Sequence, residues 1–208
     1  MRDNSLTSHA DQELYVANHE WRHKIASHGG GLRPHLDPSR DHVRGSDHPT
    51  VTLVEYGDYQ SPACVTAAAE LAGLRAGFDG ELRFVFRHFP IGDAHPLALY
   101  AAEAAEAAGA QGSFWELHDL IYRSEQDLEP TFLRKLAKTL GLDLERFDSE
   151  LAGETHLRHI MEDFQSGVDS GVNGTPTFFI NERRVDWDFD IDTLQAALEN
   201  AASPCDRP

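Results

Sequence analysis

The sequence predicts an α/β domain with a small mixed four-stranded sheet and a group of helices inserted between the second and third strands. Apolar runs of strand length lie near both ends of the domain, and a long stretch of helical pattern, from about residue 95 to 171, separates them. A chain of 208 residues, 40% of them hydrophobic, is long enough for one substantial core. We therefore expect a single domain, over residues 49–201.

The first two strands are expected at residues 50–56 (TVTLVEY) and 81–89 (ELRFVFRHF). Both are rich in β-branched and aromatic residues, a composition typical of buried strands. Residues 62–77 between them read as a helix, which predicts a right-handed strand-helix-strand unit with two parallel strands.

The third and fourth strands are expected at residues 175–181 (TPTFFIN) and 183–187 (RRVDW), joined by a turn at Asn181-Glu182. Such a short connection predicts an antiparallel hairpin. Within the inserted helices, Ser113 and Glu116 have the spacing of a capping box. An amphipathic helix at residues 190–201 is predicted to close the domain.

Residues 1–48 differ from the rest in charge and are predicted to form an N-terminal arm. They hold six basic and seven acidic residues, whereas residues 49–208 hold 12 and 28. Apolar residues at helical spacing predict a short helix at 11–27, and little regular structure is expected beyond Gly29. His19 and His23 stand one helical turn apart, but no third ligand is fixed near them. We interpret them as solvated surface and predict no metal site.

Composition excludes several classes of partner. The formal net charge of −17 is unfavourable for binding nucleic acid or anionic membranes, which need clustered basic residues. The chain shows neither a bilayer-spanning apolar run nor a signal peptide, so we expect a cytoplasmic protein. The two cysteines, Cys64 and Cys205, cannot form a disulfide framework. The last helix should carry Cys205 away from the active-site end and into the tail at 202–208, so thiol chemistry would depend on Cys64.

Four motifs occur in a characteristic order: VTLVEYGDYQSPAC, FRHFP, HPLALYAAEAAEAAGAQGSFWELHD and SGVNGTPTFFIN. Over residues 43–201 or so, the chain resembles the DsbA-like branch of the thiol:disulfide oxidoreductases. The resemblance implies a thioredoxin-like fold with a helical insertion. It also implies a Cys-x-x-Cys motif at a helix start, a cis peptide bond at a Thr-Pro pair, and a buried acid six positions before the first cysteine.

Carried onto this chain, the resemblance implies catalytic roles for Ser61, Cys64 and Glu55, and a cis bond between Thr175 and Pro176. The departure is Ser61, which occupies the position of the family's nucleophilic cysteine. A serine hydroxyl stays protonated at this site and cannot form a disulfide. We therefore predict a degenerate Ser-x-x-Cys site that cannot cycle a disulfide by itself, which leaves open whether the protein is an enzyme.

Two interpretations of Ser61 remain open. As a helix N-cap followed by Pro62, it would accept a hydrogen bond from the N–H of Ala63 or Cys64. Alternatively, it would donate to a bound thiolate, as implied by a weaker resemblance to kappa-class glutathione transferases, which share the Ser-Pro pair. The predicted function is thus a thiol- or peptide-binding or single-cysteine redox protein, with a glutathione-dependent transferase or isomerase as the alternative. No cofactor is predicted apart from glutathione in that alternative.

The remaining site residues also have two interpretations. Cys64 is either a buried small hydrophobe or a thiol assisted by Glu55. His88 and His95 either approach the site or simply end a strand and open a helix. In relatives, the backbone before the cis-proline pairs with an extended peptide, so Pro62, Thr175 and Pro176 are predicted to bind a thiol-containing peptide or protein, or glutathione. The oligomeric state is not predicted.

Overall fold

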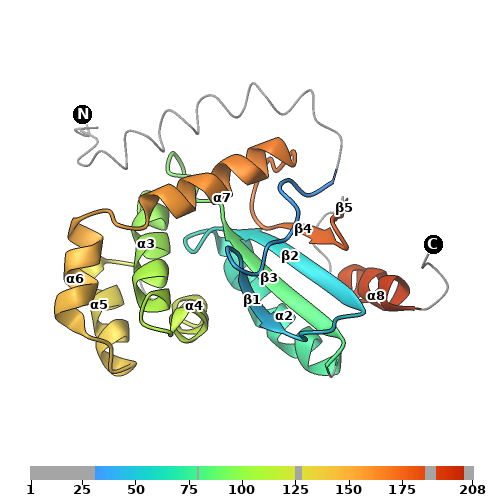
Figure 1. The fold of residues 1–208 in the computed structure, drawn as a ribbon, viewed down its shortest axis with the longest axis horizontal. Coiled ribbons are helices and arrows are strands. Elements are labelled where there is room, and N and C mark those ends of the chain that lie inside the picture. Colours follow the sequence, from blue (N-terminus) through green and yellow to red (C-terminus); the bar gives the residue numbers. More distant parts are fainter. Residues whose placement is uncertain (1–30, 79, 125–127, 186–190, 204–208) are drawn as a thin grey trace.

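The computed structural model describes residues 31–78, 80–124, 128–185 and 191–203 (Figure 1). These residues form a five-stranded sheet with the order β1-β3-β2-β4-β5. Its strands are β1 (His42–Gly45), β2 (Val51–Gly57), β3 (Leu82–His88), β4 (Thr177–Ile180) and β5 (Arg183–Val185). The helices are α2 (Pro62–Gly77), α3 (Ala98–Gly109), α4 (Phe114–Tyr122), α5 (Pro130–Thr139), α6 (Leu144–Ala152), α7 (Leu157–Asp169) and α8 (Ile191–Ala202).

The central strands and the first helix lie where the sequence predicts them. β2 pairs with β3 in parallel, and α2 connects them over the predicted residues. β4 pairs antiparallel with both β2 and β5. The β4-β5 turn holds Asn181 and Glu182 at φ 46° and 66°, which matches the twist of a tight hairpin. The predicted hairpin and parallel pair are confirmed.

The predicted strand number of four is wrong, because residues 42–45 add a fifth strand at the sheet edge. β1 pairs antiparallel with β3, with His42 opposite Phe86. The expectation of little regular structure beyond Gly29 fails here. The segment HVRG has weak strand character of its own. It is held by side chains from distant parts of the sequence, since Arg44 Nη1 donates to Asp119 at 2.9 Å and His42 stacks on Phe114.

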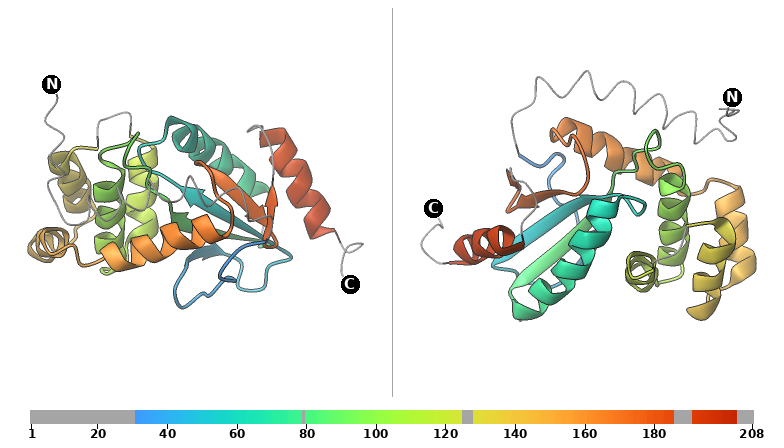
Figure 2. Two further views of the ribbon diagram at one scale, coloured as in Figure 1. Left: turned by 90° about the horizontal axis from the view of Figure 1, so that it is seen from above. Right: turned by 180° about the vertical axis from the view of Figure 1, so that it is seen from behind.

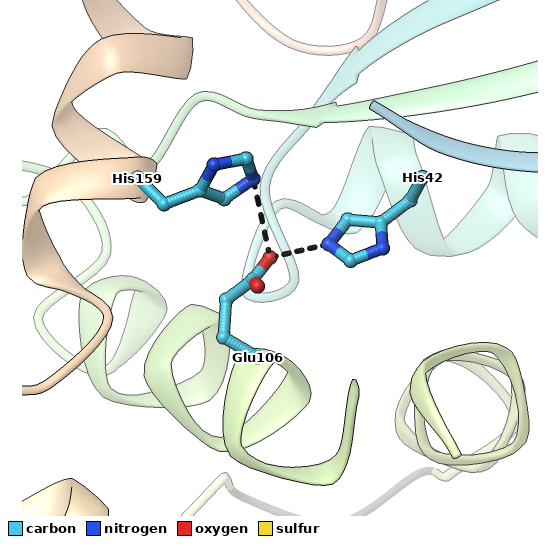
Figure 3. Close-up of side chains that lie close together, drawn as sticks. All are labelled: His42, Glu106 and His159. Carbon is cyan, nitrogen blue, oxygen red and sulfur yellow. Dashed lines mark hydrogen bonds and ion pairs between the residues drawn. The ribbon is translucent and has the colours of Figure 1, made fainter. Parts of the chain in front are cut away.

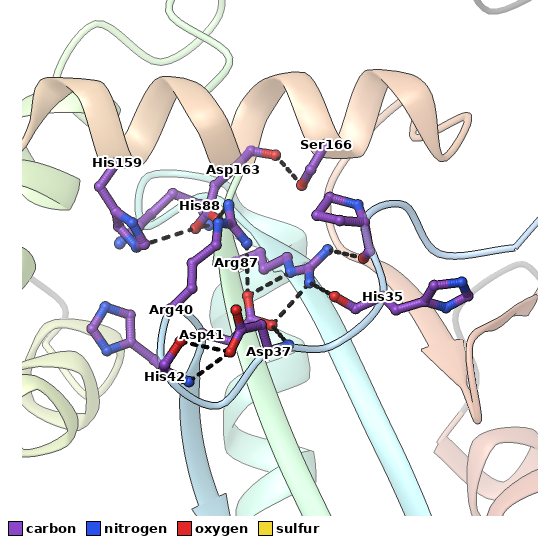
Figure 4. A network of polar contacts seen from close by, with 12 residues as sticks. His35, Asp37, Arg40, Asp41, His42, Arg87, His88, His159, Asp163 and Ser166 are labelled. Carbon is purple, nitrogen blue, oxygen red and sulfur yellow. Dashed lines mark hydrogen bonds and ion pairs between the residues drawn. The ribbon is translucent and has the colours of Figure 1, made fainter.

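Residues 31–41, which we call the strap, cross the sheet and are fixed by a buried arginine (Figure 4). Arg87 is fully buried and uses all its donors. Its Nε and Nη2 each lie 2.9 Å from a carboxylate oxygen of Asp41, and its Nη1 lies 2.9 Å from the Tyr56 hydroxyl. Two backbone carbonyls of the strap, those of Pro34 and His35, accept the rest.

Helices cover both faces of the sheet (Figures 1 and 2). α2 and α8 pack on one face, in a core that includes Leu53 and Phe84, while α7 and the strap pack on the other, against Val54 and Val85. Side chains alternate along β2, so Glu55 faces the same side as Leu53, toward α2. The inserted helices α3 to α6 lie beyond one end of the sheet.

Some sequence expectations have other outcomes. α4 begins at Phe114, next to the predicted capping box, but the Ser113 side chain makes no capping hydrogen bond. The proposed helix at 11–27, with His19 and His23, lies outside the described residues, as does Cys205.

Candidate functional site

Ser61 joins the start of α2 to the loop before β4. Its hydroxyl oxygen accepts a hydrogen bond from the Cys64 backbone N–H at 3.4 Å, and the hydroxyl donates to the Thr175 carbonyl at 3.3 Å. The helix therefore has the predicted serine N-cap, with Pro62 in the first turn. The peptide bond between Thr175 and Pro176 is cis. The structure thus brings Ser61, Cys64 and the Thr175-Pro176 pair together.

The loop that carries Ser61 is held by Asp58, which the sequence analysis did not single out. The buried Asp58 carboxylate accepts from the backbone N–H groups of Gln60 at 2.8 Å and Ile91 at 2.9 Å. Its Oδ2 also lies 2.7 Å from His95 Nδ1, and this hydrogen bond raises the pKa of His95. His95 therefore reaches the site through Asp58. The sequence did carry a signal for Asp58, because this acidic residue lies between the end of a predicted strand and the start of a predicted helix.

His88 ends β3, as the sequence predicts, and lies in a different polar cluster from Ser61. Its Nε2 is 2.8 Å from Glu106 Oε1 on α3.

Cys64 is completely buried in the first turn of α2. Burial raises the pKa of its thiol far above the usual value, and the nearby charge of Glu55 raises it further. The Asp58 N–H, 3.5 Å from the sulfur, opposes this effect but does not overcome it. Because the thiolate is the reactive form, Cys64 is a protonated, unreactive thiol at neutral pH.

Glu55 lies within the sheet, below the start of α2. It is 1% exposed, and its Oε1 has no hydrogen-bond partner among the described residues. Burial raises its pKa to about 8, against the opposing charges of Arg75 and Arg44. Its carboxyl lines a cavity of about 280 Å³ that His118 and Arg75 also line. A cavity of this size has room for water beside the carboxyl group. Glu55 is therefore a neutral acid at pH 7.

Folding stability should fall as pH rises from about 4.5 to 8, because folded Glu55 holds a proton that the unfolded chain releases near pH 4.5. The contribution of Glu55 to folding stability is complete below about pH 4.5. It is lost as the pH rises through about 8, at up to about 1.4 kcal/mol of unfolding free energy per pH unit. Glu55→Gln should flatten this decline in urea unfolding at pH 5 and pH 8. Other groups whose pKa is raised by folding, such as His95, remain in both proteins. Equal declines in the free energy of unfolding of the two proteins would therefore contradict this role for Glu55.

The rim of the site is open and apolar. Pro62 and Ala63 are exposed, while Ser61 behind them is buried. Thr175 and Pro176 are half-buried across from them. The start of α2 and the cis-proline loop therefore meet at Ser61, which is hydrogen-bonded to both, and Cys64 is buried one turn further along the helix.

Comparison with known proteins agrees with the fold. A family model described as thioredoxin matches residues 38–200. A thioredoxin-like oxidoreductase from Silicibacter pomeroyi is 31% identical in sequence, with a TM-score of 0.70 over 79% of this chain and 93% of its own. BdbD from Bacillus subtilis, 23% identical, shares the fold with a TM-score of 0.73 over 84% of this chain and 99% of its own.

Curated relatives are longer proteins. The Na⁺/H⁺ antiporter NhaA 1 of Salinispora arenicola is 46% identical over 166 residues, which are 80% of this chain and 25% of the antiporter. The chain thus spans about a quarter of the length of such relatives. Within the described residues, helices fall short of the length and apolarity that a membrane span requires. Because the family model matches most of the chain, the chain belongs to the thioredoxin family.

Proposed function

We propose that extended, thiol-containing segments of other proteins bind at Ser61, in a groove that we infer between the start of α2 and the cis-proline loop, and that the domain does not cycle a disulfide by itself. One observation carries the proposal: the Ser61 hydroxyl is hydrogen-bonded on both sides, to the Cys64 N–H and to the Thr175 carbonyl.

The chemistry of the two positions argues against disulfide cycling. Thiol-disulfide exchange needs an attacking thiolate and a second sulfur that resolves the mixed disulfide. At position 61, where the family resemblance places the attacking cysteine, this chain has a serine. Cys64 supplies one sulfur, but it is buried and its pKa is raised.

The groove keeps the features that suit an extended peptide. A carbonyl oxygen has two lone pairs, so Thr175 O still has one acceptor site beside its bond to Ser61. An added strand pairs through such backbone groups and places its side chains against an apolar rim. Pro62 and Ala63 provide that rim.

Glutathione is the alternative ligand, and its thiolate would have to compete for the Ser61 proton. That proton is donated to Thr175 O, so thiolate binding would break an existing hydrogen bond. Ion antiport is not part of the proposal, because the match covers about a quarter of each antiporter. We retain the cytoplasm as the proposed location.

The wild-type protein should leave insulin reduction by dithiothreitol at its uncatalysed rate, and should not conjugate glutathione to an aromatic chloride. It should bind a fluorescent, reduced, cysteine-containing peptide in an anisotropy titration. Ala63→Glu, at the rim, should weaken this binding about tenfold, equivalent to roughly 1.4 kcal/mol. Ala76→Glu provides the matched control, since Ala76 is an exposed alanine at the other end of α2.

Insulin reduction above the uncatalysed rate would show that the domain does cycle a disulfide, against the proposal. If the wild-type protein forms the glutathione conjugate and Ser61→Ala abolishes this activity, the protein is a transferase instead. Equal peptide affinity in the two alanine variants would place the binding surface elsewhere.

A further inference from the structure

Three histidines surround one carboxylate oxygen at the junction of the sheet edge and the inserted helices. The Nε2 atoms of His42, His88 and His159 lie 2.6, 2.8 and 3.7 Å from Glu106 Oε1. His42 belongs to β1, His88 to the end of β3, and His159 to α7, while Glu106 lies on α3. Figure 3 shows His42 and His159 both pointing at the same carboxylate oxygen of Glu106.

The cluster is largely enclosed but remains reachable from solvent. The side chains of His42 and His159 are 20% and 24% exposed, whereas that of Glu106 is 9% exposed. The His42 ring is held by parallel stacking on Phe114, with centroids 3.4 Å apart. His88 is buried and holds Glu106 from the other side. Two of the groups are therefore fixed before any ligand arrives.

Hydrogen bonding among these residues does not account for His159. Its Nε2 is 3.7 Å from Glu106 Oε1 and 3.9 Å from Asp163 Oδ2, both beyond hydrogen-bond distance. Within the described part of the chain, no hydrogen bond is recorded for the His159 side chain. Its ring nevertheless points at the oxygen that His42 contacts. A shared ligand would explain this convergence.

We propose that His42, Glu106 and His159 bind one divalent transition-metal ion, with zinc as the first choice. Their ligand atoms all lie within 4.8 Å of one another. In a tetrahedral zinc site with bonds near 2.0–2.1 Å, neighbouring ligand atoms are about 3.3 Å apart. To reach that spacing, the His42 and Glu106 ligand atoms, now 2.6 Å apart, must separate slightly, and the His159 ring must turn toward them.

The donor set defines the class of ion. Imidazole nitrogen with one carboxylate suits zinc and its transition-metal neighbours, whereas calcium and magnesium prefer oxygen alone. Two histidines and a glutamate leave a fourth position for water, as in open zinc sites. His88 acts as a positioning residue, since it contacts Glu106 rather than the ion.

The site is separate from the Ser61 groove, and the proposal does not depend on peptide binding. The ion would join β1, α3 and α7, three elements far apart in the sequence. It would thereby attach the edge strand to the inserted helices.

The test is a zinc titration of the metal-stripped protein by calorimetry. It is made in a His19→Gln, His23→Gln background, which removes the other histidine pair considered in the sequence. We expect one zinc ion per chain and a rise in Tm on binding. Co²⁺ in its place should give the visible absorption of a four-coordinate ion. Glu106→Gln should weaken zinc binding on the order of 100-fold.

His159→Gln is the decisive variant. Because the His159 side chain makes only the long contacts to Glu106 and Asp163, its loss should change the metal-free Tm little, while zinc affinity falls on the order of 100-fold. His48→Gln is the control, since it removes a histidine outside the cluster. Equal zinc affinity in His159→Gln and His48→Gln would overturn the proposal, as would a six-coordinate Co²⁺ spectrum.

Discussion

Ser61→Cys should restore disulfide chemistry to this domain. The introduced sulfur would lie at the N-cap of α2, where backbone N–H groups and the helix dipole stabilise a thiolate and lower its pKa from about 8.5 into the range of roughly 3.5–7.5. The native Ser61 hydroxyl oxygen already lies 3.4 Å from the backbone nitrogen of Cys64. A sulfur at position 61 would therefore lie close to the residue that carries the second sulfur. Glu55 and the Thr175-Pro176 loop are in place around it. We expect an internal disulfide and insulin reduction well above the uncatalysed rate.

The measurement is mass spectrometry after alkylation under mild oxidant, in a Cys205→Ser background that removes the other native thiol. Ser149→Cys is the control, because Ser149 is exposed on α6, far along the chain from Cys64. The Ser61→Cys variant should resist alkylation at both sulfurs until it is reduced. Two freely alkylated thiols in that variant would show that the backbone no longer permits the bond.

Asp41→Ala should destabilise the fold by about 3–5 kcal/mol, the usual cost of leaving one partner of a buried ion pair alone. Asp41 accepts two hydrogen bonds from Arg87, and neither side chain is exposed to solvent. Its removal leaves a buried guanidinium without its counter-charge. Urea unfolding measures the change as a lower midpoint.

Asp148→Ala is the control for this prediction, because the Asp148–Arg134 pair is on the surface. Exposed pairs contribute less than about 1 kcal/mol. Similar losses in the two variants would mean that the strap is not fixed by Arg87.

Much of the fold follows from local pattern. The buried runs that became β2 and β3, and the alanine-rich α2 after Ser61-Pro62, carry their structure in consecutive residues. The serine cap was also predictable, because a cap depends on neighbours three residues away. Family resemblance added Glu55 and Thr175-Pro176, which no local pattern joins to Ser61.

The features that sequence reasoning missed depend on contacts between distant segments. β1 is four residues long, and its environment is supplied by Phe114 and Asp119. The proposed metal site shares this property: His42, Glu106 and His159 come from three elements with no fixed spacing. A histidine pair on one predicted helix, His19 and His23, was easier to notice than a trio assembled by the fold. Asp58 was overlooked for a similar reason, since its partners Ile91 and His95 follow the next strand.

The strap also fixes an order of events during synthesis. Its residues are made before the segments that they contact: Leu32 donates its N–H to the carbonyl of Glu182, near the other end of the domain. Arg87, too, must be made before Asp41 has its partner. Until then, the face of β2 that carries Val54 and Tyr56 lacks the strap that covers it. The nascent chain therefore presents an apolar sheet face until the later segments of the domain are made, a surface that chaperones bind and that aggregation exploits.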